Sequence, residues 1–355
     1  MRFRLAVFAP VALLLGAVSA PQSAVQKASF HVQNAFSVNL PKGAQRVRVW
    51  FAVPQQDADS VIRNFSVAAD APVRYEVDSW GNRVGYVEFD APTVEKTLIR
   101  EEFDLVRSEV RNSVDPAATR PLTEAERTAL VRYLQPTTHV VINDKVKALS
   151  ASIVGTETNP VLMARKLYDW TLQNVDYWVK DPEHLKASPV GSTEYCLTSK
   201  TGNCTDFHSL FASLAMASGL PTRIVYGSLL KPTLNGVPVD GSYHCWIQFY
   251  APKLGWIPLD ASLANIYGKK FALNEKNQKL VELTTATGYK GFDPTKVDFY
   301  FGNLDDRRVV WSVGRDLILQ PPQDGGPVNA LAKAYVEIDG KPATNWTREL
   351  TYKEL

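Results

Sequence analysis

One short segment, Gly202-Asn203-Cys204-Thr205-Asp206-Phe207-His208, most constrains what this chain can fold into. After its cysteine, apolar residues recur at intervals of three and four, the spacing of one helix face: Phe207, Leu210, Phe211, Leu214 and Ala217. Gly219 and Pro221 end the pattern. The sequence therefore predicts a helix with Cys204 in its first turn. Backbone N–H groups there have no internal partner and carry partial positive charge, which favours a thiolate.

Two aromatic-rich segments downstream, Tyr243–Tyr250 and Gly255–Ala261, predict neighbouring strands. Side chains alternate along a strand, so His244 and Cys245 lie on opposite faces. We expect His244 to face the helix thiol and Cys245 to point away from it. The second strand ends with Asp260, whose carboxylate can hold the tautomer and orientation of an imidazole. A thiol, an imidazole and a carboxylate together are what a cysteine nucleophile needs, because the free thiol is mostly protonated at neutral pH.

This pattern resembles the transglutaminase-like superfamily of papain-type thiol enzymes, over roughly residues 159–263. Four stretches occur in the family's order: Gly-Asn-Cys-Thr-Asp-Phe-His-Ser-Leu-Phe from 202, Ala-Ser-Gly-Leu-Pro-Thr-Arg from 217, His-Cys-Trp from 244 and Trp-Ile-Pro-Leu-Asp from 256. By that resemblance Cys204 would be the nucleophile, His244 the general base and acid, and Asp260 the orienting carboxylate. The resemblance implies no cofactor. An oxyanion role for Tyr177 or Trp178 is a further hypothesis.

The resemblance also implies the reaction. A thiol of this kind attacks a peptide or carboxamide carbonyl and forms an acyl-enzyme, so we expect a protein or peptide substrate. Water as the acceptor gives a peptidase or amidase, whereas an amine gives a transglutaminase-type cross-link. We favour hydrolysis slightly. The alternative from another class is a binding or assembly protein of the same fold that has lost turnover.

Competing roles exist for several of these residues. His208 lies four residues after Cys204, on the same helix face, and competes for the role of base. Asp260 could instead cap the turn that follows it. Asp206 is expected to stabilise the helix N-terminus or to pair with Arg223.

A zinc site is the next alternative, since the chain carries several potential ligands: Cys196, Cys204, His208, His244 and Cys245. None of their spacings is the close pair of cysteines that indicates zinc, so the sequence predicts no metal. The three cysteines leave at least one thiol unpaired. A bridge from Cys196 to Cys245, or a reversible one to Cys204, stays open, with buried free thiols for Cys196 and Cys245 as the expectation.

Residues 1–20 predict a secretory signal peptide, because Arg2 and Arg4 precede an apolar run over Leu5–Val18 and small residues follow. An uncleaved anchor is the alternative. We expect an exported protein, periplasmic or secreted, with no stable membrane insertion after cleavage. Loss of the two arginines takes the formal net charge from +2 to about 0, which argues against nucleic acid as a partner.

The rest of the chain predicts an α+β protein, with helices packed on an antiparallel sheet after an all-β sandwich domain. We place the sandwich at 28–112, the catalytic core at 113–268 and a β-rich extension at 269–355. Expected strands in the sandwich are 30–32, 46–53, 61–67, 74–78, 83–89 and 97–110. Helices are expected from Thr123 to Pro136 and after Asn159, and a strand over 223–230. Short strands at 296–301, 308–313 and 333–338 would extend the catalytic sheet or form a cap.

Overall fold

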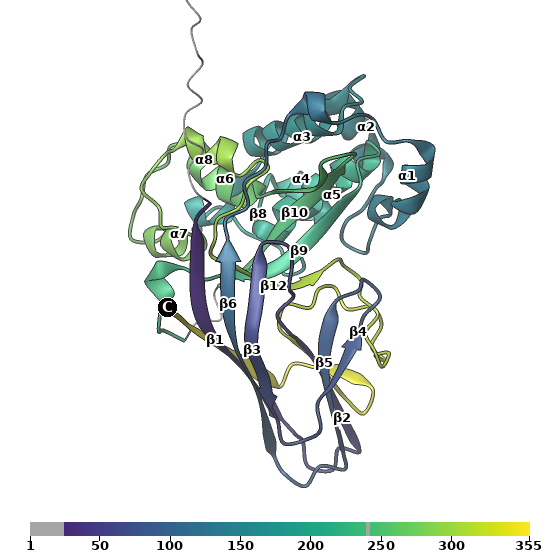
Figure 1. Cartoon of the computed structure of the whole chain (residues 1–355), viewed down its shortest axis with the longest axis vertical. Coiled ribbons are helices and arrows are strands. Elements are labelled where there is room, and N and C mark those ends of the chain that lie inside the picture. Colours follow the sequence, from purple (N-terminus) through teal and green to yellow (C-terminus); the bar gives the residue numbers. More distant parts are fainter. Residues whose placement is uncertain (1–24, 239–241) are drawn as a thin grey trace, which may run out of the picture.

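The computed structural model describes residues 25–238 and 242–355, so the predicted signal peptide lies outside the described residues. Figure 1 shows a lower part made of long strands and an upper part in which helices surround a sheet. The C-terminus lies beside β1, at the junction of the two parts. The α+β class is confirmed, because both parts contain antiparallel sheets and only the upper one contributes the helices.

The strands are β1 (Lys27–Asn39), β2 (Arg46–Ala52), β3 (Ser60–Ala68), β4 (Arg74–Val77), β5 (Arg83–Asp90), β6 (Lys96–Ser108), β7 (Asp176–Tyr177), β8 (Thr201–Gly202), β9 (Thr222–Leu229), β10 (Tyr243–Ala251), β11 (Gly255–Leu259), β12 (Arg308–Val313), β13 (Ala334–Ile338), β14 (Lys341–Ala343) and β15 (Trp346–Glu354). The helices are α1 (Glu124–Ala129), α2 (Asp144–Val154), α3 (Pro160–Asn174), α4 (Thr193–Ser199), α5 (Cys204–Ala217), α6 (Ala261–Gly268), α7 (Gln278–Thr284) and α8 (Pro294–Phe299).

The lower part is built from two antiparallel sheets, in the orders β15-β1-β6-β3 and β14-β13-β2-β5-β4. Apolar side chains from both sheets pack between them, among them Phe36, Val49, Phe51, Val87 and Ile99. The alternation of buried and more exposed positions along β1 is what a strand with one core-facing side requires. The six strands expected in this region are all present, β1 being longer than predicted.

The last strands of the chain complete this sandwich. β15 pairs with β1 along Phe30–Val38, and β13 pairs with β2. The loop before β13 also covers the outer face of β2, where Trp50 Nε1 donates to the carbonyl of Pro321 at 3.0 Å. The two ends of the chain therefore fold together, and the upper part is inserted between them.

The upper part contains a four-stranded sheet, in the order β11-β10-β9-β12. β12 comes from the tail and extends this sheet, as expected for residues 308–313. The strand expected over 333–338 is present as β13, but it pairs with β2 in the sandwich, so for this strand both expectations are wrong. The strand predicted over 296–301 is wrong, because α8 occupies Pro294–Phe299. The Asp293 side chain accepts a hydrogen bond from Thr295 N at 3.0 Å, and Pro294 is preorganised for the first helical turn.

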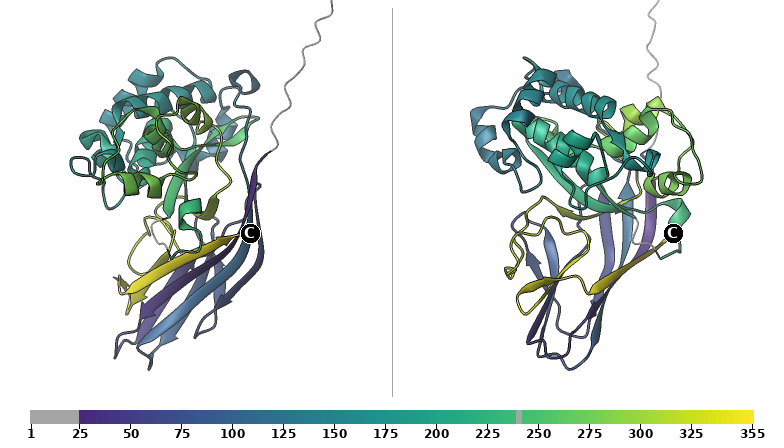
Figure 2. Two further views of the ribbon diagram at one scale, coloured as in Figure 1. Left: turned by 90° about the vertical axis from the view of Figure 1, so that its left-hand side faces the viewer. Right: turned by 180° about the vertical axis from the view of Figure 1, so that it is seen from behind.

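Helix α5 is the central element of the upper part, and almost all of its side chains are buried. It packs on β9 and β10, and the other helices gather over the same side of the sheet (Figure 2). None of the helices among the described residues is long and apolar enough to cross a membrane.

Candidate active site

Cys204 is the first residue of α5, and reciprocal hydrogen bonds between Asn203 and Asp206 stabilise this end of the helix. The Asn203 side chain accepts from the backbone N–H groups of Thr205 and Asp206, at 2.9 and 3.1 Å. The Asp206 carboxylate in turn accepts from Asn203 N at 3.0 Å. This reciprocal cap confirms that Asp206 stabilises the helix N-terminus. Its pairing with Arg223 is not observed, since Arg223 donates to Gln248 instead, at 2.8 Å.

The same carboxylate ties a loop to the helix. Asp206 also accepts from the backbone N–H groups of Ser188 and Ser192, at 3.0 and 2.8 Å. Burial raises the pKa of Asp206, although these hydrogen bonds to the charged form oppose the shift. Gly202 makes the close packing possible, because a Cβ atom there would lie 2.3 Å from the Cβ of Asp206. The position of Cys204 is thus fixed by its neighbours on both sides.

His244 and Asp260 form a buried pair. Nε2 of His244 lies 2.7 Å from Oδ2 of Asp260, and both side chains are inaccessible or nearly so. Asp260 also caps α6, where its Oδ1 accepts from Leu263 N at 3.1 Å and from Ser262 Oγ at 2.9 Å. The capping role and the orienting role, which the sequence presented as alternatives, are both present in one carboxylate.

Arg308 is a member of this site that sequence reasoning missed. It lies on β12, is fully buried, and places Nη1 2.8 Å from Oδ2 of Asp260. Its Nη2 lies 2.7 Å from Oδ2 of Asp305. Arg308 is far from the other site residues along the chain and lies within an ordinary apolar strand pattern, so no local motif marks it. Only the pairing of β12 with β9 brings it beneath Asp260.

The protonation states follow from these contacts. The hydrogen bond with the Cys245 thiol is the largest cause that lowers the pKa of Cys204 well below its usual value, and the hydrogen bond and charge of His244 add to it against the effect of burial. Burial alone would lower the pKa of His244, but the charge and hydrogen bond of Asp260 raise it to about 9. Burial would raise the pKa of Asp260, yet the charges of His244 and Arg308 hold it well below its usual range. Together these shifts favour a thiolate beside an imidazolium.

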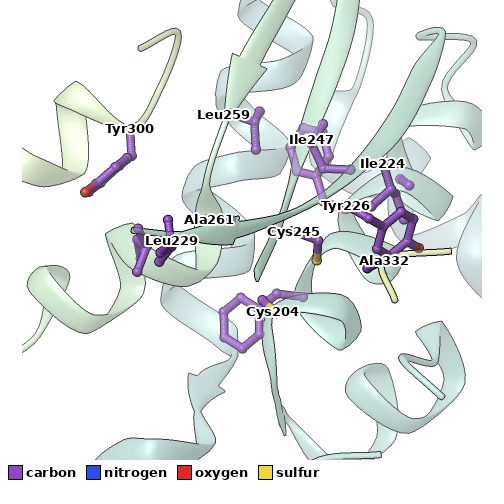
Figure 3. Close-up of a cluster of buried hydrophobic side chains, with 14 of the residues drawn as sticks. Cys204, Ile224, Tyr226, Leu229, Cys245, Ile247, Leu259, Ala261, Tyr300 and Ala332 are labelled. Atoms are coloured by element: carbon purple, nitrogen blue, oxygen red, sulfur yellow. The ribbon is translucent and has the colours of Figure 1, made fainter. Parts of the chain in front are cut away.

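Cys245 does not point away from Cys204, and that expectation is wrong. Its Sγ atom lies 3.3 Å from Nδ1 of His208 and 3.6 Å from Oγ1 of Thr205, and it hydrogen-bonds to Cys204. Figure 3 shows the side chains of Cys204 and Cys245 close together within the buried cluster. The reason is that α5 packs on the face of β10 that carries Cys245, so this thiol meets the first turns of the helix.

His208 sits behind this pair rather than beside the nucleophile. Its Nδ1 faces Cys245, and its Nε2 lies 3.7 Å from Oδ1 of Asp260. Burial lowers the pKa of His208 to about 4, which leaves the ring neutral near pH 7. Asp260 therefore stands between two imidazoles, and each imidazole is next to a different thiol.

A cavity of about 170 Å³ opens onto Cys204. Its lining residues come from five parts of the upper domain: Tyr177, Trp178, Asn203, Cys204, Lys231, Tyr243, His244, Leu283 and Thr284. Cys204 is 4% exposed and His244 2%, so the reactive atoms lie at the bottom of this cavity. Burial raises the pKa of Tyr177 well above its usual value, which keeps its hydroxyl protonated, and a backbone hydrogen bond links that hydroxyl to Cys204.

The remaining questions of the sequence concern disulfide bridges and a possible metal site. Cys196, Cys204 and Cys245 are all buried free thiols, so the expectation for Cys196 and Cys245 is confirmed and neither open bridge is formed. Across residues 25–238 and 242–355, no group of three or more His, Cys, Asp or Glu side chains is arranged to hold a metal ion.

Comparison with known proteins identifies the core. Residues 147–261 match a family model described as the transglutaminase-like superfamily. An uncharacterised protein of Haemophilus influenzae is 23% identical over 345 residues, 89% of this chain and 88% of that protein. A Pseudomonas aeruginosa protein named protein-glutamine gamma-glutamyltransferase is 24% identical over 123 residues, which are 33% of this chain and 18% of that protein.

A solved structure extends the likeness to the whole fold. The crystal structure of a Cytophaga hutchinsonii protein, described as a candidate cysteine protease, has a TM-score of 0.57 at 15% identity. The match covers 92% of this chain and 91% of that one, so the arrangement of the sandwich and the core is shared. The core at residues 147–261 is therefore similar to the transglutaminase-like superfamily, and the whole chain shares its fold with the Cytophaga hutchinsonii structure.

Proposed function

We propose that this chain is a thiol enzyme that cleaves peptide or carboxamide bonds through an acyl-enzyme. The Cys204 thiolate attacks the carbonyl carbon, and a tetrahedral intermediate forms. His244, protonated at the start, gives its proton to the departing amine, and a thioester remains. His244 then takes a proton from water, which attacks the thioester and releases the acid and the free thiolate. The observation that carries the proposal is the 2.7 Å contact between His244 and Asp260. The same His244 imidazole hydrogen-bonds to Cys204.

The oxyanion of the intermediate needs donors. The backbone N–H of Cys204 lies in the first turn of α5, where it has no partner within the helix. The Tyr177 hydroxyl is held protonated by burial, lines the same cavity and contacts that N–H group. We therefore assign oxyanion stabilisation to these two groups, which preorganised donors of this kind can provide.

The acyl acceptor decides between two activities, and we favour water. The Pseudomonas aeruginosa relative is named a glutamyltransferase, so acyl transfer to an amine is the rival outcome. A glutamine-containing peptide incubated with and without a primary amine separates them. Hydrolysis predicts the glutamic acid product with ammonia release whether or not the amine is present. A predominant amide-linked amine adduct would assign the transferase activity instead.

The first test is the pH dependence of iodoacetamide labelling at Cys204, read by peptide mass spectrometry, in the parent and in His244→Ala. Labelling that stays fast well below the ordinary thiol pKa of about 8.5, and slows in the variant, supports the proposal. Slow labelling that rises only near that value in both would favour a binding or assembly protein. The 4% exposure of Cys204 is the observation on the side of that alternative.

Export is part of the proposal and rests on the charged and apolar pattern of residues 1–20. Fractionation of cells that express the full chain, with N-terminal sequencing of the mature product, tests it. A product cut near residue 20 outside the cytoplasm is expected. An intact N-terminus in the cytoplasmic fraction would contradict it.

A further inference from the structure

Lys231 is a buried lysine in the wall of the catalytic cavity. It lies two residues after the end of β9, is 2% exposed, and lines the cavity together with Cys204 and His244. Lysine is almost never this buried unless its ammonium is paired. Among residues 25–238 and 242–355, however, no carboxylate forms an ion pair with it. The cavity is thus lined by a buried lysine that has no carboxylate partner within the described part of the chain.

The position of Lys231 is fixed from the other part of the molecule. The Tyr352 hydroxyl, on β15, donates to the Lys231 carbonyl at 3.0 Å. Burial lowers the pKa of Lys231 to about 7, and the charge of Cys204 is what opposes the shift. The cost of burying an unpaired ammonium is therefore substantial, and a nearby anion would offset it.

Lys180 is a second buried lysine of this chain, and its ammonium group is paired with a carboxylate. Lys180 is 7% exposed, but its Nζ lies 3.3 Å from Oδ1 of Asp176. It does not line the cavity around Cys204. Lys180 is thus a matched comparison, because it is also buried and lies close in sequence to Trp178 of the cavity, but has an ion-pair partner.

We propose that Lys231 forms an anion subsite in the catalytic cavity, which binds a carboxylate of the substrate next to the carbonyl that Cys204 attacks. The inference rests on the proposed function, since it names the class of acyl substrate. The carboxylate can belong to an acidic side chain beside the scissile bond or to a free C-terminus. In either case the cavity, closed to water by the bound substrate, strengthens the ion pair.

The subsite can be tested without any turnover. Iodoacetate and iodoacetamide alkylate the same thiolate, but only iodoacetate carries a carboxylate. At pH 6, where Lys231 is protonated, we expect the ratio of iodoacetate to iodoacetamide rates at Cys204 to exceed the ratio in Lys231→Met by about tenfold or more, the effect of a charged hydrogen bond. The ratio in the parent should fall as the pH rises through about 7.

Three controls make the result specific. Lys231→Arg keeps the charge and should retain much of the preference, and Lys180→Met should leave the ratio unchanged. Lys231→Met replaces an unpaired ammonium by an apolar chain of similar length, so it should fold with an undiminished Tm. Asp240 lies outside the described residues, and Asp240→Asn tests whether this chain supplies the anion itself. A preference for iodoacetate that emerges only in Asp240→Asn would overturn the proposal, as would equal ratios in the parent and Lys231→Met.

Substrate peptides then identify the source of the carboxylate. Matched peptides carry Glu or Gln beside the scissile amide, and a free or amidated C-terminus. The proposal expects kcat/KM to favour one of the two carboxylates by about tenfold in the parent and not in Lys231→Met. Neutral peptides cleaved as fast as acidic ones would overturn the subsite but leave the thiol enzyme intact. A normal alkylation preference with no cleavage of any peptide would instead count against the proposed function alone.

Discussion

Arg308 places Nη1 2.8 Å from Oδ2 of Asp260, the same oxygen that accepts the hydrogen bond from His244. One buried carboxylate thus holds a cation of fixed charge on one side and a titrating imidazole on the other. Because Arg308 keeps its charge at every accessible pH, Asp260 stays ionised whether or not His244 is protonated. The strand that carries Arg308 therefore helps to set the charge state of the proposed site.

Removal of the arginine should destabilise the fold. Arg308→Gln leaves two carboxylates, Asp260 and Asp305, without their buried cation, and we expect the free energy of unfolding to fall by about 3–5 kcal/mol. Urea denaturation measures it. Arg165→Gln is the control, because Arg165 pairs with Asp169 near the surface and such pairs contribute about 1 kcal/mol or less. Equal losses in both variants would contradict the role given to Arg308.

The pH profile of the reaction should be bell-shaped. The ion pair needs a deprotonated Cys204 and a protonated His244, so activity rises above the lowered pKa of the thiol and falls as pH passes the His244 value of about 9. Asp260→Asn removes the charge that raises the His244 pKa, and the alkaline limb should move to lower pH. The measurement is kcat/KM from pH 5 to 10, with circular dichroism to verify folding. An unmoved alkaline limb in the variant would rule out His244 as its origin.

The thiol of Cys245 should lower the pKa of the Cys204 thiol. Cys245→Ala removes the hydrogen bond that is the largest cause of the lowered pKa of Cys204, so the midpoint of iodoacetamide labelling at Cys204 should shift to higher pH. Cys196→Ala is the matched control, a buried free thiol that is not among the causes of that shift. An unchanged midpoint in Cys245→Ala, or the same shift in both variants, would refute the coupling.

A carboxyl group far from the catalytic cavity should make stability depend on pH. Glu101 is fully buried in the sandwich, and burial raises its pKa to about 8, although Asn34 donates to it at 2.6 Å. The folded state therefore holds a proton that the unfolded state releases above about pH 4.5, and the free energy of unfolding falls by about 1.4 kcal/mol per pH unit up to about pH 8.

Glu101→Gln keeps a neutral group of the same shape and should abolish this loss. The difference in Tm between variant and parent should be small at pH 4.5 and large at pH 8, with the variant more stable. Glu102→Gln, a neighbouring residue that is not fully buried, is the control and should show no such trend. A parent and Glu101→Gln with parallel Tm curves would mean that Glu101 is already ionised in the fold.

The local pattern of the sequence was enough to place the helix at Cys204, the strand that carries His244 and a strand that ends just before Asp260. Periodicity, caps and turn residues act over a few positions, so they can be found without the fold. The same local logic failed at residues 296–301, where apolar alternation outweighed the helix start at Asp293 and Pro294. It also predicted the wrong direction for the Cys245 side chain. Strand alternation shows which side chains share a face of the sheet, but not which face a helix covers.

The amino-acid sequence by itself determined the α+β class and singled out the three residues proposed to form the site, because each of these rests on short-range spacing. Tertiary structure alone decided that Arg308 lies against Asp260, that Cys245 meets Cys204, and that Lys231 lines the cavity. These contacts depend on which strands pair and which face α5 covers, and on a sandwich closed by both ends of the chain. Such long-range pairings arise from the burial of whole elements, which no local pattern records.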